Sequence, residues 1–317
     1  MSEELFYYFN TNLECEDLLK KEMELFFPEL RLSYSRPCFL TFKGSAHFKD
    51  RIFKRQWFFA RRAGVSLERT NGHEIKGKVL SIVEQRKFRC IHVWNANLTQ
   101  YKSTDLPELS PASADSEMIL DVIKVRTDEF WIGEHRHYAH ISPFAGGDPQ
   151  IILPETSSSR AYLKWAEVFA HYPKLSQVKA TIVELGAAPG GGSQFLVEQN
   201  FKVIAIDPGL MKYEGARYLQ LSVQDVNRKT IENPQSVVGM AVDMNLSPLQ
   251  SAKETLRVQS YYPELQWVII NLKMTKVELI DALKKIEKQF RDSLFPNISF
   301  LSLPSHKREV MLIAYRD

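Results

Sequence analysis

The feature that most constrains the fold is the stretch from Thr181 to Asp207, TIVELGAAPGGGSQFLVEQNFKVIAID. An apolar run that ends at Leu185 is followed by a glycine-rich turn, a helical segment over 193–199 and a second apolar run that ends in Asp207. Strand, turn, helix, strand and acid in this order are typical of a nucleotide-binding βαβ unit. We therefore expect a largely parallel sheet that binds a ligand where the first of these strands ends.

The turn consists of Gly186, Ala187, Ala188, Pro189, Gly190 and Gly191, and it is not the GxGxxG pattern of dinucleotide-binding proteins. Pro189 has no backbone N–H and a fixed φ, so the turn is poorly suited to wrapping a pyrophosphate. It suits a ligand that needs close approach of the backbone but carries no phosphate, such as S-adenosylmethionine. Asp207 is placed to accept hydrogen bonds from the ribose diol of that cofactor.

The bulk properties indicate an ordinary globular protein of 317 residues, which is enough for about two domains. The net charge of +3 permits a polyanionic partner without requiring one. The 3 cysteines are scattered without metal-binding spacing, which indicates free thiols in a reducing compartment. We expect a cytoplasmic protein without a membrane span, because no apolar run approaches ~18–20 residues and the N-terminus lacks a signal-peptide pattern.

The N-terminal half predicts an α+β region that precedes the sheet described above. Residues 1–71 show the order β-α-β-β-α-β, which is the plan of ferredoxin-like domains, with strands at 5–9, 31–35, 38–42 and 58–68 and helices at 14–27 and 46–57. Further along, the pattern predicts a helix at 74–87, a strand at 88–94, a polar loop at 95–117, a hairpin within 118–141 and a linker at 143–154.

A basic and aromatic stretch, KDRIFKRQWFFARR, covers residues 49–62 and holds six basic residues and one acid. Cations neutralise phosphates and aromatic rings stack on bases, so the stretch suits a nucleic-acid surface. The predicted RNA contacts are Lys54, Arg55, Trp57, Arg61 and Arg62. The alternative interpretation is a solvated helix face over an aromatic core.

Three histidines lie within residues 134–140, and strand alternation places His135 and His137 on one face. No cysteine or carboxylate constellation accompanies them, so we expect a polar or RNA-facing strand and no metal.

From residue 155 onward, predicted helices and strands alternate, which indicates a doubly wound, mostly parallel sheet. About four residues, 305–308, separate the last two predicted strands. This connection is too short for a parallel crossover, so the final strand is expected to be antiparallel. Such a sheet fits the class I (Rossmann-like) S-adenosylmethionine-dependent methyltransferase fold better than a dehydrogenase.

Several polar residues fall where ligands bind in such sheets, outside the carboxyl ends of the strands. Asp243 and Lys273 each follow an apolar run, and Asp225 follows the predicted strand at 217–222. Asp225 is a candidate acceptor for an adenine amino group, although a plain loop aspartate is an equally good interpretation. Lys164, on the helix before the first strand, and Glu309, at the start of the final strand, are each more often surface charges when taken alone.

Five segments occur in the same order and at similar spacing in the FtsJ-type ribose 2′-O-methyltransferases: SRAYLK, VELGAAPGGGSQ, the strand that ends at Asp243, NLK and REVMLIA. The resemblance covers residues 157–317 and implies a catalytic tetrad of Lys164, Asp243, Lys273 and Glu309. It implies that Lys273 takes the proton of a ribose 2′-OH as this oxygen attacks the methyl group. Asp243 is then expected to hold Lys273 and to bind the cofactor near its cationic end. Burial beside Lys164 is expected to favour the neutral form of Lys273.

Within that family the chain resembles the RlmM type, which methylates a cytidine ribose of 23S rRNA. RQWFF at 55–59, SPF at 142–144, NLKM and the HxRE of 306–309 carry this resemblance. It implies a ferredoxin-like domain at 1–71, a THUMP-like RNA-binding region at 72–150 and a methyltransferase domain at 151–317. Two departures stand out: the THUMP-like region is short, and Gly192 stands where these families have Trp after PGG.

Three other functions are compatible with parts of the pattern. The target could be tRNA or another rRNA position, which only methylation mapping separates. A non-catalytic RNA-binding assembly factor would need no tetrad. An NAD-dependent oxidoreductase is opposed by Pro189 and by the missing GxGxxG. The sequence predicts no oligomeric state.

Overall fold

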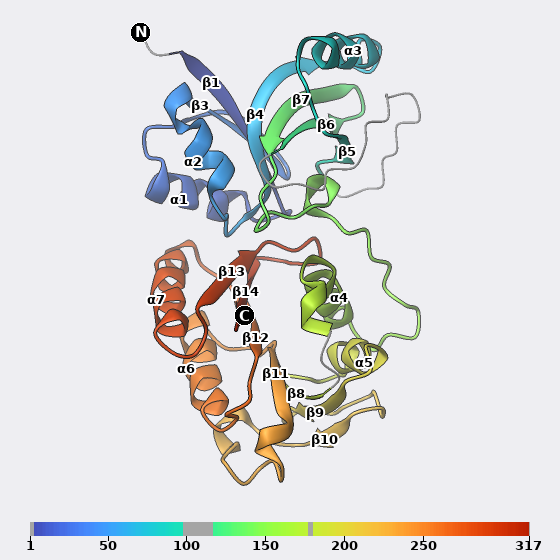
Figure 1. The fold of residues 1–317 in the computed structure, drawn as a ribbon, viewed down its shortest axis with the longest axis vertical. Helices are drawn as coiled ribbons and strands as arrows, with labels where there is room; N and C mark the ends of the chain where they lie inside the picture. Colours follow the sequence, from blue (N-terminus) through green and yellow to red (C-terminus); the bar gives the residue numbers. More distant parts are fainter. Residues whose placement is uncertain (1–2, 98–116, 177–179, 317) are drawn as a thin grey trace. The chain divides into compact units, whose positions relative to one another are not determined.

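The computed structural model describes residues 3–97, 117–176 and 180–316, so the predicted polar loop at 95–117 lies largely outside the described residues. The chain divides into two compact units, Met1–Pro149 and Gln150–Asp317 (Figure 1). Each unit is built on its own seven-stranded sheet.

One continuous sheet, in the order β2-β3-β1-β4-β7-β6-β5, runs through the first unit. The described residues 3–71 show the expected β-α-β-β-α-β order, and the pairing of β4 with β7 joins them to residues 72–149. The ferredoxin-like and THUMP-like relationships remain predictions. The elements are β1 (Glu4–Thr11), α1 (Glu16–Phe26), β2 (Arg31–Arg36), β3 (Phe39–Ser45), α2 (Lys49–Lys54), β4 (Ala60–Thr70), α3 (Ile75–Gln85), β5 (Ile91–Asn95), β6 (Met118–Arg126) and β7 (Glu129–Arg136).

The second unit has the strand order β10-β9-β8-β11-β12-β14-β13. The strands from β10 to β12 pair in parallel, while β14 is antiparallel to both β12 and β13, as expected for the final strand. The elements are α4 (Ala161–His171), β8 (Thr181–Leu185), α5 (Gly191–Glu198), β9 (Lys202–Ile206), β10 (Arg217–Leu219), β11 (Val237–Val242), α6 (Pro248–Gln259), β12 (Trp267–Lys273), α7 (Ile280–Arg291), β13 (Asn297–Leu301) and β14 (Glu309–Tyr315).

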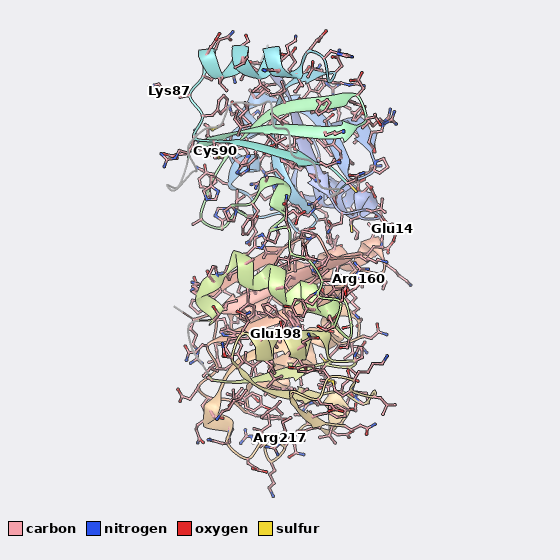
Figure 2. The ribbon with its side chains drawn as sticks, turned by 90° about the vertical axis from the view of Figure 1, so that its right-hand side faces the viewer. Glu14, Lys87, Cys90, Arg160, Glu198 and Arg217 are labelled. Carbon is pink, nitrogen blue, oxygen red and sulfur yellow. The ribbon has the colours of Figure 1, made fainter. Side chains whose placement is uncertain are left out.

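Helices cover both faces of this second sheet, with α4 and α5 on one face and α6 and α7 on the other (Figure 1). Figure 2 marks the first pair by Arg160, which precedes α4, and Glu198, which ends α5. On the α4 side, Trp165 and Phe169 pack with Trp267 and Ile269 in one buried apolar cluster. Because β8, β9, β11 and β12 are parallel, their carboxyl ends lie at one edge of the sheet, which is where a site is expected.

Candidate active site

The glycine-rich turn brings the backbone close to its surroundings at the end of β8. Gly186 has a φ of 80°, and a Cβ there would lie 2.5 Å from the carbonyl oxygen of Asp243. Only glycine combines this left-handed conformation with such a close approach. Gly190, with a φ of 112°, precedes α5 directly. The turn therefore passes against the chain segment that follows β11, the next strand in the sheet.

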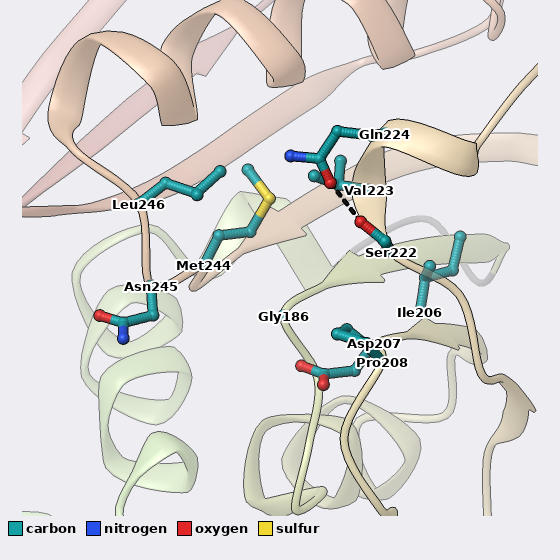
Figure 3. A pocket seen from close by; sticks show the side chains of 10 residues that line it. All are labelled: Gly186, Ile206, Asp207, Pro208, Ser222, Val223, Gln224, Met244, Asn245 and Leu246. Carbon is teal, nitrogen blue, oxygen red and sulfur yellow. Dashed lines mark hydrogen bonds between the residues drawn. The ribbon is translucent and has the colours of Figure 1, made fainter.

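A pocket of about 290 Å³ opens beside Gly186 (Figure 3). Its walls come from three further chain segments, which are residues 206–208, 222–224 and 244–246. Apolar side chains such as Ile206, Val223 and Leu246 suit a flat heterocycle, and this volume lies near the ~300 Å³ lower end for ligand sites. The Asp207 carboxylate accepts hydrogen bonds from Ala188 N at 3.2 Å and Gly209 N at 2.6 Å, which fixes it at the pocket wall.

Of the predicted cofactor residues, the turn residues 187–191 do not line this pocket, whereas Gly186 and Asp207 do. Asp225, which is exposed, and Asp243 also lie outside the lining, and their contacts with the cofactor stay predictions. Ser222, Val223 and Gln224, which precede Asp225, form one wall of the pocket. Arg257 on α6 fixes the wall by donating hydrogen bonds to the carbonyl oxygens of Val223 at 2.6 Å and Val226 at 2.7 Å.

The four residues predicted as a tetrad lie together at the edge of the sheet. Lys164 Nζ on α4 donates to Asp243 Oδ2 at 2.9 Å and to Glu309 Oε1 at 3.0 Å. Lys273 is the cross-strand partner of Glu309 at the junction of β12 and β14. Its Nζ lies 3.7 Å from Asp243 Oδ1, which is an ion-pair distance but too long for a hydrogen bond.

The charges of this cluster are uneven. Burial lowers the pKa of Lys164, but Asp243 and Glu309 outweigh it, so the pKa is raised overall and Lys164 stays a cation. Burial raises the pKa of Asp243, but Lys164, Asn271 and Lys273 outweigh it, so its pKa is lowered and it stays an anion. Lys164 is therefore held by hydrogen bonds to two acids, whereas Lys273 has the longer ion-pair contact with Asp243.

Sequence reasoning missed Asn271, whose Nδ2 donates to Asp243 Oδ1 at 2.8 Å and to Glu309 Oε1 at 3.0 Å. The signal was present, because a polar residue interrupts the apolar run WVIINL.

His306 is a second residue that the sequence did not single out for this site. Its Nδ1 accepts a hydrogen bond from Leu303 N at 3.2 Å, and its ring is 3% exposed. Burial lowers the pKa of His306 to about 4, despite the opposing charges of Glu309 and Asp243, so it is neutral near pH 7. It therefore adds no charge beside the tetrad.

Most of the residues that were predicted to contact RNA are buried in the first unit, so the prediction that they form an exposed surface is wrong. Trp57, Arg61 and Arg62 are 7%, 6% and 1% exposed. Arg55 contacts the buried Glu22 at 3.4 Å and lies over the Phe26 ring. Only Lys54 is exposed. The alternative interpretation, a solvated helix face over an aromatic core, describes α2 only, because Arg61 and Arg62 lie buried on β4.

Arg62 belongs to a buried polar network that explains how an arginine can lie in the core. It donates to the carbonyl oxygens of Ser142 at 2.9 Å and Phe144 at 2.6 Å, and it lies 3.1 Å from His135 Nε2. His135 contacts the buried Asp121 carboxylate through its other nitrogen. Buried charges survive when they are paired and hydrogen-bonded.

The same network corrects the interpretation of His135 as part of a polar or RNA-facing strand, because it is 1% exposed. Burial lowers the pKa of His135 to about 4. Within residues 3–97, 117–176 and 180–316, no three His, Cys, Asp or Glu side chains gather in a metal-binding arrangement. The helices of these ranges are all too short or too polar to cross a bilayer.

Comparison with known proteins identifies the class of the second unit. The model of the FtsJ-like methyltransferase family matches residues 157–295. A protein named Ribosomal RNA large subunit methyltransferase M, from Tolumonas auensis, is 29% identical over 183 residues, which cover 50% of each chain. A protein of the same name from Marinobacter nauticus is 28% identical over 191 residues, 51% of this chain and 52% of its own. The fibrillarin pre-rRNA processing protein of Methanococcus jannaschii matches 61% of this chain and 81% of its own at 14% identity and a TM-score of 0.36.

The second unit therefore has the Rossmann-like α/β fold of a methyltransferase. The match of residues 157–295 to the FtsJ-like methyltransferase model, together with the relatives named above, confirms the predicted resemblance to the FtsJ-like proteins of the RlmM type. The chain spans about half the length of the curated relatives it matches.

Proposed function

We propose that this protein transfers a methyl group from S-adenosylmethionine to a ribose 2′-OH of RNA, with a cytidine of 23S rRNA as the favoured target. The observation that carries the proposal is the convergence of Lys164, Asp243, Lys273 and Glu309 at the sheet edge, joined by contacts of 2.9–3.7 Å. The names of the curated relatives support rRNA as the substrate class.

The pocket beside Gly186 fits the adenosine part of the cofactor. Its apolar walls accommodate a flat ring, and Asp207 at the end of β9 offers a carboxylate to a ribose diol. Gly186 allows close approach of the backbone, and the described residues that line the pocket include no lysine or arginine that would favour a phosphate. The bound cofactor supplies a sulfonium methyl group as the electrophile.

In the proposed mechanism Lys273 acts as the general base. A neutral Lys273 Nζ accepts the proton of the 2′-OH while the ribose oxygen forms its bond to the methyl carbon, and the sulfur–carbon bond breaks with the electron pair going to sulfur. Lys164 and Asp243 stay charged and hold the geometry of the site. Positioning of the two reactants supplies much of the rate, and a base of this kind contributes about 10²–10⁴-fold.

We further propose that residues 1–150, with the ferredoxin-like region at 1–71 and the THUMP-like region at 72–150, form a platform for the RNA. The buried arginines of the 49–62 stretch support the fold of this unit, so its RNA contacts must come from other exposed side chains. Lys54 remains available.

Methyl transfer from labelled S-adenosylmethionine to in vitro transcribed 23S rRNA tests the proposal, and mapping of the modified nucleotide identifies the target. We expect Lys273→Ala to lose transfer by at least ~10²-fold while cofactor binding is retained. Lys276→Ala, an exposed lysine three residues away, is the matched control and should stay active. Residues 150–317 alone should bind cofactor but fail on RNA. Near-normal transfer by Lys273→Ala would refute the assignment of the base. Transfer to tRNA alone would refute 23S rRNA as the substrate and identify tRNA in its place.

A further inference from the structure

Asn271 is a polar residue in a row that otherwise builds the core. Trp267, Ile269, Asn271 and Lys273 alternate along β12 and therefore face the same side of the sheet. Trp267 is 4% exposed, while Ile269 and Asn271 are both 0% exposed. A buried amide destabilises a fold unless its hydrogen-bonding groups find partners, so the partners of Asn271 indicate its role.

The amide nitrogen of Asn271 bridges the two acids of the tetrad. Nδ2 lies 2.8 Å from Asp243 Oδ1 and 3.0 Å from Glu309 Oε1, so its two hydrogens serve two carboxylates. A flipped amide would place its oxygen against both carboxylates, so this orientation is fixed by the neighbouring charges. The other end, Oδ1, is buried and makes no hydrogen bond to the described part of the chain. The unsatisfied oxygen destabilises the fold, and the two hydrogen bonds from Nδ2 offset this loss.

The bridge also determines what is left for Lys273. Each oxygen of Asp243 already accepts a hydrogen bond, Oδ2 from Lys164 and Oδ1 from Asn271. Lys273 Nζ remains at 3.7 Å from Oδ1, outside hydrogen-bond distance. A short charge-assisted bond to Asp243 would favour the ammonium form of Lys273 and oppose its action as a base.

We propose that Asn271 is a positioning residue, which fixes Asp243 and Glu309 and keeps Lys273 from forming a close ion pair with Asp243. The proposal rests on the proposed function, because it concerns the lysine that accepts the 2′-OH proton. As a neutral donor, Asn271 satisfies a carboxylate oxygen that would otherwise draw in the ammonium group of Lys273. Its effect should therefore appear in the pH dependence of catalysis and not in cofactor binding.

The test measures kcat against pH for transfer to saturating in vitro transcribed 23S rRNA, with Asn271→Leu and Asn271→Asp compared to the wild-type chain. Asn271→Leu removes the amide that bridges the two acids and keeps a side chain of similar size. Asn271→Asp replaces the amide by a third acid. In both variants the rising limb of kcat should move about one unit to higher pH, which lowers kcat about tenfold at a pH below the limb. The KM for S-adenosylmethionine should change less than about twofold, since Asn271 is not part of the pocket wall.

Gln259→Leu is the matched control, because Gln259 is another buried amide with an unpartnered oxygen within the described chain, on α6 at the opposite face of the sheet. Its pH profile should equal that of the wild type. An unshifted limb in both Asn271 variants would overturn the positioning role, whether kcat stays normal or falls together with thermal stability. A wild-type chain without transfer to this RNA would instead refute the proposed function itself, so the two failures are distinguishable.

Discussion

A sharp prediction concerns Glu184, an acid that lies under the cofactor turn. It is 1% exposed, and it accepts hydrogen bonds from Trp165 Nε1 at 2.9 Å and from the hydroxyl of Ser193. Both donors are neutral. Burial therefore raises the pKa of Glu184 from 4.5 to about 7, in spite of the two hydrogen bonds. Glu184→Gln imitates the protonated acid, because the amide oxygen can accept from Trp165 while the NH₂ donates to Ser193.

The sign and size of the effect follow from proton linkage. Below pH 4.5 the acid is protonated in both the folded and unfolded chain, so wild type and variant should unfold with similar free energies. As the pH rises toward 7, the unfolded acid ionises while the folded acid stays protonated, which destabilises the wild type alone. A pKa of about 7 in the folded chain against 4.5, at 1.36 kcal/mol per pKa unit, amounts to about 3 kcal/mol. The advantage of Glu184→Gln should grow by about 1.4 kcal/mol per pH unit and level off above pH 7.

Urea unfolding of both chains, followed by circular dichroism at pH 4.5, 6 and 8, measures this difference. Comparing variant with wild type cancels the titration of all other groups, including the buried His135 and His306. Glu264→Gln, at an exposed position before β12, is the control and should show no pH-dependent gain. A stability difference that stays constant across the pH range would refute the reasoning, because it would mean that the pKa of Glu184 is the same in the folded and unfolded chain.

Two further predictions concern packing. Gly192→Ala should lower the free energy of unfolding by about 1–3 kcal/mol, because its Cβ would lie 2.1 Å from Glu184 Oε1 and 2.3 Å from Trp165 Nε1. Gly77→Ala is the control in the same urea titration and should not lower the free energy of unfolding, because its Cβ meets no atom within 4 Å. An equal loss in both variants would contradict this account. Arg62→Met should destabilise the first unit by about 3–5 kcal/mol, since it leaves the network around Asp121 and His135 without its arginine. Thermal unfolding measures that loss, and an unchanged transition would show that Arg62 is not needed in the core.

The strand ends of the second unit could be predicted from the sequence because each one is marked by a local pattern, and the parallel sheet brings these strand ends together. Apolar runs that end in Asp207, Asp243 and Lys273 predict strand ends, and parallel strands share their carboxyl edge. The short 305–308 connection predicts the antiparallel pairing that sets Glu309 across from Lys273. Asp243 and Lys273 could thus be placed at the sheet edge from the local pattern, whereas Lys164 and Glu309 were added to the tetrad by the family resemblance.

Charge burial in the first unit could not be predicted in the same way. Arg61 and Arg62 follow each other in a basic stretch, yet both lie in the core, because Asn10, Gly146, Ser142 and Phe144 supply acceptors from distant parts of the chain. A local pattern of cations and rings is the same whether the cations face solvent or internal carbonyl groups. Only the fold decides between the two, through contacts that are up to 85 residues apart.

The surroundings of Gly192 likewise depend on a contact between residues far apart in the chain, and this contact lies beside the cofactor turn. A Cβ at residue 192 would lie 2.3 Å from Trp165 Nε1, so the space beside Gly192 is filled by the indole of Trp165 from α4. That indole is fully buried and donates its N–H to Glu184 at the base of the turn. The helix that supplies Lys164 to the tetrad therefore also supplies the aromatic ring beneath the turn, in consecutive residues. The indole of Trp165 therefore occupies the space that a side chain at residue 192 would need, and it supports the turn through its hydrogen bond to Glu184.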